Sequence, residues 1–227
     1  MSVSRRTWTI ALLFAASGLC GCGDGQSPAV PPAPIDEGIA LPSAVAQATT
    51  DAPPAPPPSP REIFWQRLSA LCGQAFAGYL TVGTEESDRA FGESDMTMHV
   101  RDCNEQEIRI PFAVGENRSR TWVVRATEAG LSLHHRHVDE SGRSAAPDNY
   151  GGNTATEGSM RRQEFVVNEA TKAQLPETRF NVWAMEVVPG KTFAYELQRP
   201  QEERYFRVEF DLDQPIETPP APWGETG

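Results

Sequence analysis

Hydrophobic residues recur at every second position through most of the chain between residues 76 and 212. Successive side chains of a β-strand point to opposite faces, so this period predicts strands with one apolar face. The apolar positions form nine groups, at 76–82, 96–100, 108–114, 122–126, 131–137, 165–167, 183–187, 193–197 and 206–212. Short turn-forming segments separate most of them. The sequence therefore predicts a mainly β protein, an antiparallel meander of about eight or nine strands.

We expect this meander to close into a small barrel, because closure covers the exposed edges of a sheet. A two-sheet sandwich is the alternative. Residues 139–160 interrupt the alternation with polar and turn-forming residues. A loop of this length is uncommon in a compact domain, and we expect it to lie over one end of the barrel.

Two helices are predicted beside the strands. Ser59 and Glu62 match a capping box, and Pro60 suits the first helical position. Gly73 is expected to end this N-terminal helix. A second, short helix is expected over residues 168–175.

The first 22 residues are organised like a bacterial export signal. Arg5 and Arg6 precede an uncharged run over residues 8–19, which is too short to span a bilayer. The sequence Leu-Cys-Gly-Cys at 19–22 resembles the lipobox of bacterial lipoproteins. The resemblance implies that residues 1–21 are a signal peptide and that Cys22 becomes the lipidated N-terminus, carrying acyl chains such as palmitate. Ordinary secretion with cleavage nearby is the alternative.

The resemblance also implies a location. Two or three acyl chains hold a protein at a membrane stably, whereas one binds only marginally. Gly23, and not Asp, follows Cys22. In Gram-negative lipoproteins this favours the outer membrane, so we expect a cell-envelope protein that faces the periplasm. Residues 4–8 also resemble part of a twin-arginine signal, which leaves the export route open.

The sequence divides into four parts. After the signal peptide, residues 22–60 hold the lipidated Cys and a Pro-rich stretch. Residues 28–60 contain 11 of the 20 prolines and no Lys or Arg, which predicts a disordered tether that favours polyproline II. Residues 61–217 are expected to form one β-rich domain, and residues 218–227 a disordered tail.

Charge excludes one class of partner. The formal net charge is −11, and the Lys and Arg residues are scattered. A chain of this kind is unsuited to binding nucleic acid. The membrane is therefore expected as a partner only through the lipid anchor.

Two cysteines remain in the predicted domain, Cys72 and Cys103. In an oxidising compartment such a pair most simply forms a disulfide. This bridge would tie the N-terminal helix to the sheet and contribute roughly 3–4 kcal/mol on the chain-entropy model.

Histidines are the main candidates for a metal site. His135 and His137 fall on one face of a predicted strand, and His99 lies in another strand that could supply a third ligand. A transition-metal site with hydrolytic activity, completed by His99 or Asp139, is thus one hypothesis. The alternative is that His135 and His137 lie near the barrel mouth, hydrogen-bonded to carboxylates. No other cofactor is expected.

Acidic and basic residues alternate on several predicted strands. They are Glu164, Glu186, Glu196, Glu209, Arg125, Arg162 and Arg207. Paired carboxylates can perform acid–base chemistry, but cross-strand Arg–Glu ladders on a solvated face are commoner. The sequence also lacks Gly-x-Ser-x-Gly, Ser-x-x-Lys, His-Glu-x-x-His and phosphate-binding glycine motifs, which favours a protein without enzymatic activity.

Several blocks resemble a group of uncharacterised secreted Gram-negative bacterial proteins with no established activity. They lie at residues 108–112, 118–123, 150–152, 181–186, 193–197 and 206–210. The resemblance covers residues 70–213. It implies export and one shared domain, and it assigns no functional residue.

The sequence therefore favours a lipid-anchored protein whose barrel binds a small apolar ligand or another envelope protein. Candidate ligand-binding residues are Trp122, Trp183, Phe193 and Tyr195, for which packing in the core is the alternative role. The pattern leaves the identity of the ligand and the oligomeric state open.

Overall fold

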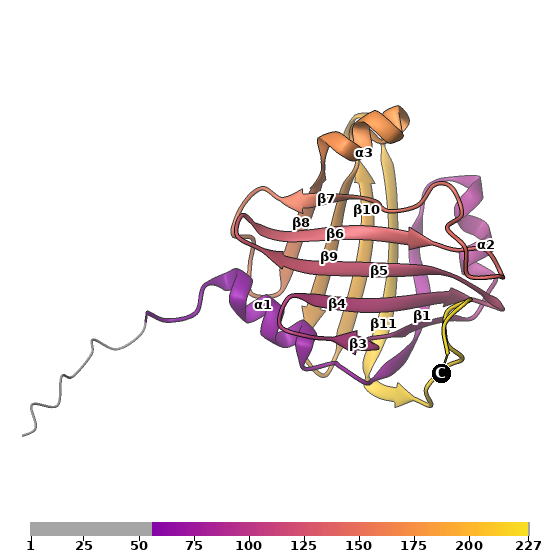
Figure 1. The fold of residues 1–227 in the computed structure, drawn as a ribbon, viewed down its shortest axis with the longest axis horizontal. Coiled ribbons are helices and arrows are strands. Elements are labelled where there is room, and N and C mark those ends of the chain that lie inside the picture. Colours follow the sequence, from indigo (N-terminus) through magenta and orange to yellow (C-terminus); the bar gives the residue numbers. More distant parts are fainter. Residues whose placement is uncertain (1–55, 227) are drawn as a thin grey trace, which may run out of the picture. The chain divides into compact units, whose positions relative to one another are not determined.

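The computed structural model of this chain describes residues 56–226 (Figure 1). They belong to a unit that spans Pro53–Gly227. The predicted signal peptide, Cys22 and most of the Pro-rich stretch lie outside the described residues. Within residues 56–226, no helix has the length and apolar character needed to cross a membrane.

Within the described part of the chain, eleven strands form the sheet. They are β1 (Ala75–Gly83), β2 (Met96–His99), β3 (Asp102–Cys103), β4 (Glu107–Val114), β5 (Asn117–Thr127), β6 (Gly130–His137), β7 (Tyr150–Thr154), β8 (Arg162–Val167), β9 (Val182–Val188), β10 (Thr192–Arg199) and β11 (Arg204–Ile216). From β4 to β11 each strand pairs with the next, and β11 then pairs with β1 and β1 with β2, all antiparallel.

Pairing between β2 and β4 closes the sheet into a ten-stranded barrel. The two-residue strand β3 is the one extra strand, paired with β4 further along its length. In Figure 1, β4–β7 run across the front, and β9–β11 cross behind them. Because the sheet closes on itself, the predicted barrel is confirmed and the alternative of a two-sheet sandwich is wrong.

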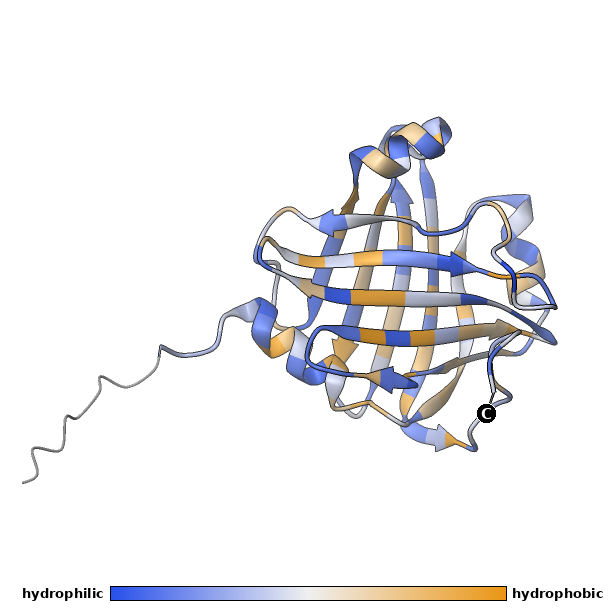
Figure 2. Ribbon diagram, viewed as in Figure 1, coloured by the Kyte–Doolittle hydropathy of each residue, from blue (hydrophilic) through white to orange (hydrophobic). Residues whose placement is uncertain are grey.

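Alternation along the strands places the hydrophobic core inside the barrel. Figure 2 shows hydrophobic and hydrophilic residues succeeding one another along most of the longer strands. Fully buried side chains include Ile108, Ile110, Leu133, Trp183 and Phe210. The period of two in the sequence thus predicted most of the inward-facing residues correctly, although Ala126, which it also included, is exposed.

Helix α1 (Pro60–Ser69) contributes to this core. Ser59 accepts a hydrogen bond from the amide of Glu62, and the Glu62 carboxylate accepts one from the amide of Ser59, which confirms the capping box. Phe64 and Leu68 are fully buried in the barrel core. The helix ends at Ser69, earlier than the expected Gly73, and lies at one end of the barrel (Figure 1).

Short helical segments occupy other connections. They are η1 (Glu86–Asp88), α2 (Arg89–Gly92), α3 (Glu169–Gln174), η2 (Pro176–Thr178) and η3 (Pro200–Glu202). Helix α3 confirms the second predicted helix, and Asn168 caps it by accepting a hydrogen bond from the Thr171 amide.

The predicted loop over residues 139–160 contains a strand, β7, that the hydrophobic pattern did not indicate. Its sequence Tyr-Gly-Gly-Asn-Thr has no apolar alternation. Gly151 pairs with His134 of β6, and a Cβ atom at Gly151 would overlap the carbonyl oxygen of Leu133. Close approach of the two backbones therefore requires glycine here, and glycine conceals the strand from a hydrophobic pattern.

The C-terminal segment also differs from the expectation of a disordered tail over residues 218–227. The Arg118 guanidinium donates to the carbonyl oxygen of Ala221 at 2.7 Å. Arg101 pairs with Glu225 at 2.9 Å and donates to the carbonyl oxygen of Thr226. These contacts hold the described part of the segment, residues 218–226, against the outside of the barrel.

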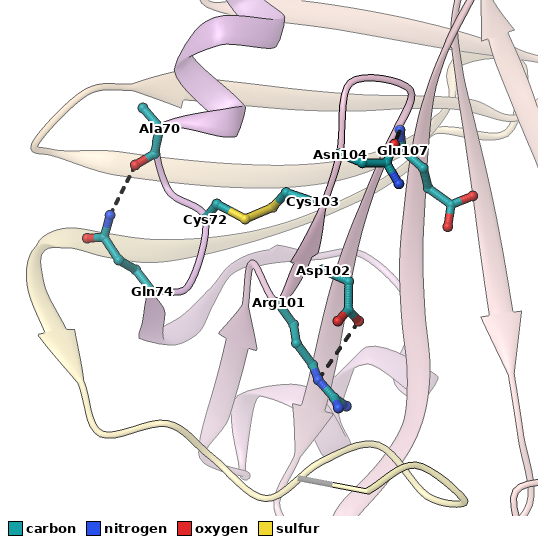
Figure 3. The surroundings of a disulfide bond; sticks show 8 residues. All are labelled: Ala70, Cys72, Gln74, Arg101, Asp102, Cys103, Asn104 and Glu107. Atoms are coloured by element: carbon teal, nitrogen blue, oxygen red, sulfur yellow. Dashed lines mark hydrogen bonds and ion pairs between the residues drawn. A yellow bond between two sulfur atoms is a disulfide. The ribbon is translucent and has the colours of Figure 1, made fainter.

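The Cys72–Cys103 disulfide is present, as the sequence predicted. Cys72 follows α1 and Cys103 lies in β3, so the bond links the helical end of the domain to the sheet (Figure 3).

Candidate ligand-binding cavity

A cavity of about 250 Å³ lies in the barrel at the end bordered by α2. Side chains from α2, β4–β7, β10 and β11 line it. A larger hollow of about 450 Å³ lies outside the barrel beside α1, between Glu62 and Gly130. The interior cavity is the candidate site, because barrel strands surround it and its walls combine aromatic and polar groups.

Five aromatic side chains that line this cavity contact one another in a closed sequence, which we call the aromatic ring. Its members are Phe91, Phe112, Trp122, Tyr195 and Phe206. Neighbouring ring centroids, taken in that order and back to Phe91, lie 6.2, 4.6, 4.4, 6.4 and 5.0 Å apart. These separations are typical of favourable aromatic pairs, so the five side chains stabilise one another's positions.

A buried hydrogen-bonded pair forms one side of the cavity. The Tyr195 hydroxyl lies 2.7 Å from Nε2 of His135, and Nδ1 of His135 lies 3.2 Å from the carbonyl oxygen of Tyr150. A carbonyl oxygen only accepts, so Nδ1 carries the proton and Nε2 accepts the Tyr195 proton. Burial lowers the pKa of His135 to about 3 and raises that of Tyr195. Both groups are therefore neutral at neutral pH.

Arg120 is the exceptional charge at this cavity. It lies directly across from His137 in the β5–β6 pairing, on the inward face. Its guanidinium carbon is 5.5 Å from the centre of the Phe91 ring. Within residues 56–226 the guanidinium forms no ion pair, and its Nη1 atom is buried without a hydrogen-bond partner. Burial lowers the pKa of Arg120.

The other arginines at the cavity are neutralised. Arg204 makes two hydrogen bonds of 2.7 Å to the two carboxylate oxygens of Asp88. Arg136 pairs with Asp148 at 3.0 Å. Burial alone would raise the pKa of Asp148, but bonds from Ser144, the His137 amide and Arg136 hold it below its usual value. Arg120 thus supplies a positive charge that the described chain does not balance.

The predicted ligand-binding residues divide into two pairs. Trp122 and Tyr195 line the cavity, whereas Trp183 and Phe193 are buried in the core outside its lining. Sequence reasoning missed Phe91, Arg120 and Tyr150. For Arg120 a signal existed: it lies two residues before Trp122, so extending the alternation by one step places it inside the barrel.

The three candidate metal ligands do not come together. Across residues 56–226, no group of three His, Cys, Asp or Glu side chains could hold a metal ion. His99 lies in β2 near Arg101 and outside the cavity lining. Both ring nitrogens of His135 are already hydrogen-bonded. His137 lines the cavity, and Asp148 accepts a hydrogen bond from its backbone amide. The expected hydrogen bonds from the rings of His135 and His137 to carboxylates are not found among the described residues, and the His135 ring bonds to Tyr195 and Tyr150 instead.

The acidic residues of β8–β11 form a cross-strand ladder. Glu196 is buried and pairs with Arg162 at 2.8 Å and with Arg207. Arg207 also contacts Glu186 at 3.2 Å and Glu209 at 2.6 Å. Burial alone would raise the pKa of Glu196, but bonds from Arg162, Gln198 and Arg207 hold it low. These carboxylates lie outside the cavity lining and are neutralised by arginine.

Comparison with known proteins found no matching family model, no matching curated protein and no matching solved structure.

Proposed function

We propose that this protein is a lipid-anchored protein of the bacterial cell envelope whose barrel binds a small ligand without transforming it. The observation that carries the proposal is a cavity of about 250 Å³ lined by the aromatic ring. Ligand sites are commonly apolar cavities with a few placed polar groups. This volume lies just below the usual range of roughly 300–1,000 Å³, so the ligand is small.

The protonation states of His135 and Tyr150 at the cavity support binding without chemistry. A general acid or base works best with a pKa near the working pH. The pKa of His135 lies at about 3, and burial raises the pKa of Tyr150 to about 12. Neither group exchanges protons readily at neutral pH.

Binding is tested by native mass spectrometry of the full-length chain, purified without chelator. We expect an additional organic mass on the wild type. The Leu197→Trp variant should lose it, because Leu197 lines the cavity and a larger side chain fills the space. The Val166→Trp variant adds the same group at an exposed position on β8 and should retain it. A bare wild-type mass, or equal loss in both variants, would contradict the proposal.

The proposed location rests on the lipobox at residues 19–22, and the Cys72–Cys103 bond suits an oxidising compartment. We propose an outer-membrane lipoprotein that faces the periplasm. Radiolabelled palmitate should enter the wild-type chain and fail to enter the Cys22→Ser variant, and the wild type should fractionate with outer membranes. Labelling that survives Cys22→Ser would place the lipid elsewhere.

A further inference from the structure

We propose that the cavity takes a compact organic carboxylate, whose anionic group pairs with Arg120 while its apolar body lies against the aromatic ring. This inference rests on the proposed binding function and names the ligand class.

Arg120 is the one arginine at the cavity whose charge no carboxylate of the described residues balances. Asp88 balances Arg204 and Asp148 balances Arg136, each through hydrogen bonds of 2.7–3.0 Å. Arg120 has no such carboxylate among the described residues, although its Nη1 atom is buried. A partly buried cation without a counterion carries a desolvation cost. A ligand with one negative charge supplies the missing counterion.

The hydrogen-bonding groups around the Arg120 guanidinium favour a carboxylate as the anionic group of the ligand. Guanidinium groups bind carboxylates through two parallel hydrogen bonds. His137 is the cross-strand neighbour of Arg120, and the charge of Arg120 acts on both His137 and Tyr150. Both side chains line the cavity, and the Tyr150 hydroxyl keeps its proton at neutral pH. They place two further hydrogen-bonding groups beside the guanidinium.

The aromatic ring defines the rest of the ligand. Trp122 stacks between Phe112 and Tyr195, with interplanar angles of 14° and 20°. Arg120 lies over Phe91, a member of the same ring, so the charge and the apolar wall adjoin. A cavity of about 250 Å³ suits a flat or short apolar body better than a long acyl chain.

Two isosteric probes test this inference, 4-fluorobenzoate and 4-fluorobenzamide, which differ in charge. Binding to the full-length chain is followed through ¹⁹F line broadening. We expect the wild type to bind the carboxylate at least about tenfold more tightly than the amide, since hydrogen bonds to charged groups contribute more than neutral ones. Arg120→Met should remove this preference.

Two further variants make the result specific. Arg120→Lys keeps the charge without the two-pronged geometry, and it should retain part of the preference. Arg89→Met removes the same charge from an exposed site on α2, outside the cavity lining, and should keep the whole preference. Circular dichroism and thermal unfolding verify that each variant is folded.

The outcomes separate this inference from the function on which it rests. Equal binding of both probes by the wild type overturns the carboxylate assignment and leaves a ligand-binding cavity. Loss of the preference in Arg89→Met as well as Arg120→Met shows a non-specific effect of net charge and also overturns it. Displacement of the probe by hexadecanoate at equal concentration contradicts a compact ligand. If the wild type binds neither probe, the inference is overturned. The proposed binding function is tested separately, by native mass spectrometry of the ligand that co-purifies with the chain.

Discussion

His135 shows how one buried side chain can make stability depend on pH. Its ring is neutral in the folded barrel because burial disfavours the charged form, and its pKa falls to about 3. In the unfolded chain a histidine titrates near 6.5. Between these values the unfolded state binds a proton that the folded state does not.

We predict that the free energy of unfolding is greatest above pH 6.5 and falls as the pH drops toward 3. At 1.36 kcal/mol per pKa unit, His135 accounts for a loss of at most roughly 5 kcal/mol. In His135→Gln the glutamine amide can also donate and accept hydrogen bonds but does not titrate. The free energy of unfolding of this variant should therefore change less with pH between pH 6.5 and 4. Urea denaturation at a series of pH values measures it.

His137→Gln is the matched control, because His137 is only half-buried and should change the slope less. An unchanged slope in His135→Gln would show that His135 is not the source of the pH dependence.

Among the elements, β8–β11 are joined by side chains as well as by backbone pairing. Glu196 on β10 is 2% exposed and bonds to Arg162 of β8 and Arg207 of β11. Removing one partner of a buried ion pair leaves the other charge poorly compensated. Arg162 and Arg207 each retain another carboxylate, Glu164 and Glu209, which limits the effect.

We predict that Glu196→Gln lowers the free energy of unfolding by about 2 kcal/mol. Glu164→Gln, at a side chain that is 58% exposed, should change it by less than about 0.5 kcal/mol. Urea denaturation at pH 7 compares the two variants. Equal effects would mean that burial of Glu196 does not matter to the ladder.

Strand β7 contains two glycines, Gly151 and Gly152, at which a Cβ atom would overlap the backbone of a neighbouring strand. A Cβ atom at Gly151 would overlap backbone atoms of Leu133, which belong to the neighbouring strand and cannot rotate away. We predict that Gly151→Ala lowers the free energy of unfolding by about 2 kcal/mol or more. Gly92→Ala in α2 meets only ordinary contacts and should be neutral or slightly stabilising. Thermal unfolding distinguishes these outcomes, and comparable values for both variants would contradict the argument.

For the whole molecule, the Cys72–Cys103 bond restricts the unfolded chain across a sequence separation of 31 residues. We predict that replacing both cysteines by Ala costs about 3–4 kcal/mol on the chain-entropy model. Urea denaturation of the variant and of the reduced wild type should give similar midpoints, both lower than that of the oxidised protein. A loss below about 1 kcal/mol would show that the unfolded chain is already compact in this region.

Much of the fold is encoded locally. The period of two identified nine of the eleven strands, and Ser59, Pro60 and Glu62 fixed the start of α1. These features depend on residues only two to four positions apart, so the sequence shows them directly. The two missed strands, β3 and β7, are a two-residue segment and a glycine-containing segment without an apolar face.

The candidate site was predictable only in part. Of the four candidate ligand-binding residues, Trp122 and Tyr195 line the cavity, whereas Trp183 and Phe193 do not. This difference depends on where each residue lies within the closed barrel. The hydrophobic pattern gives the face of a strand and not the depth of a residue within a closed barrel. Phe91 joined the aromatic ring from a short helix that no strand pattern includes.

The sequence by itself determined the antiparallel strands, their inward faces, the helix cap and the disulfide pair, because neighbouring residues or simple counting specify each of them. Only the tertiary structure decided that β2 pairs with β4, that residues 218–226 contact the barrel, and that no carboxylate of residues 56–226 pairs with Arg120. Closure and compensation of charge depend on distances between residues far apart in the chain. Those distances exist only once the barrel has formed.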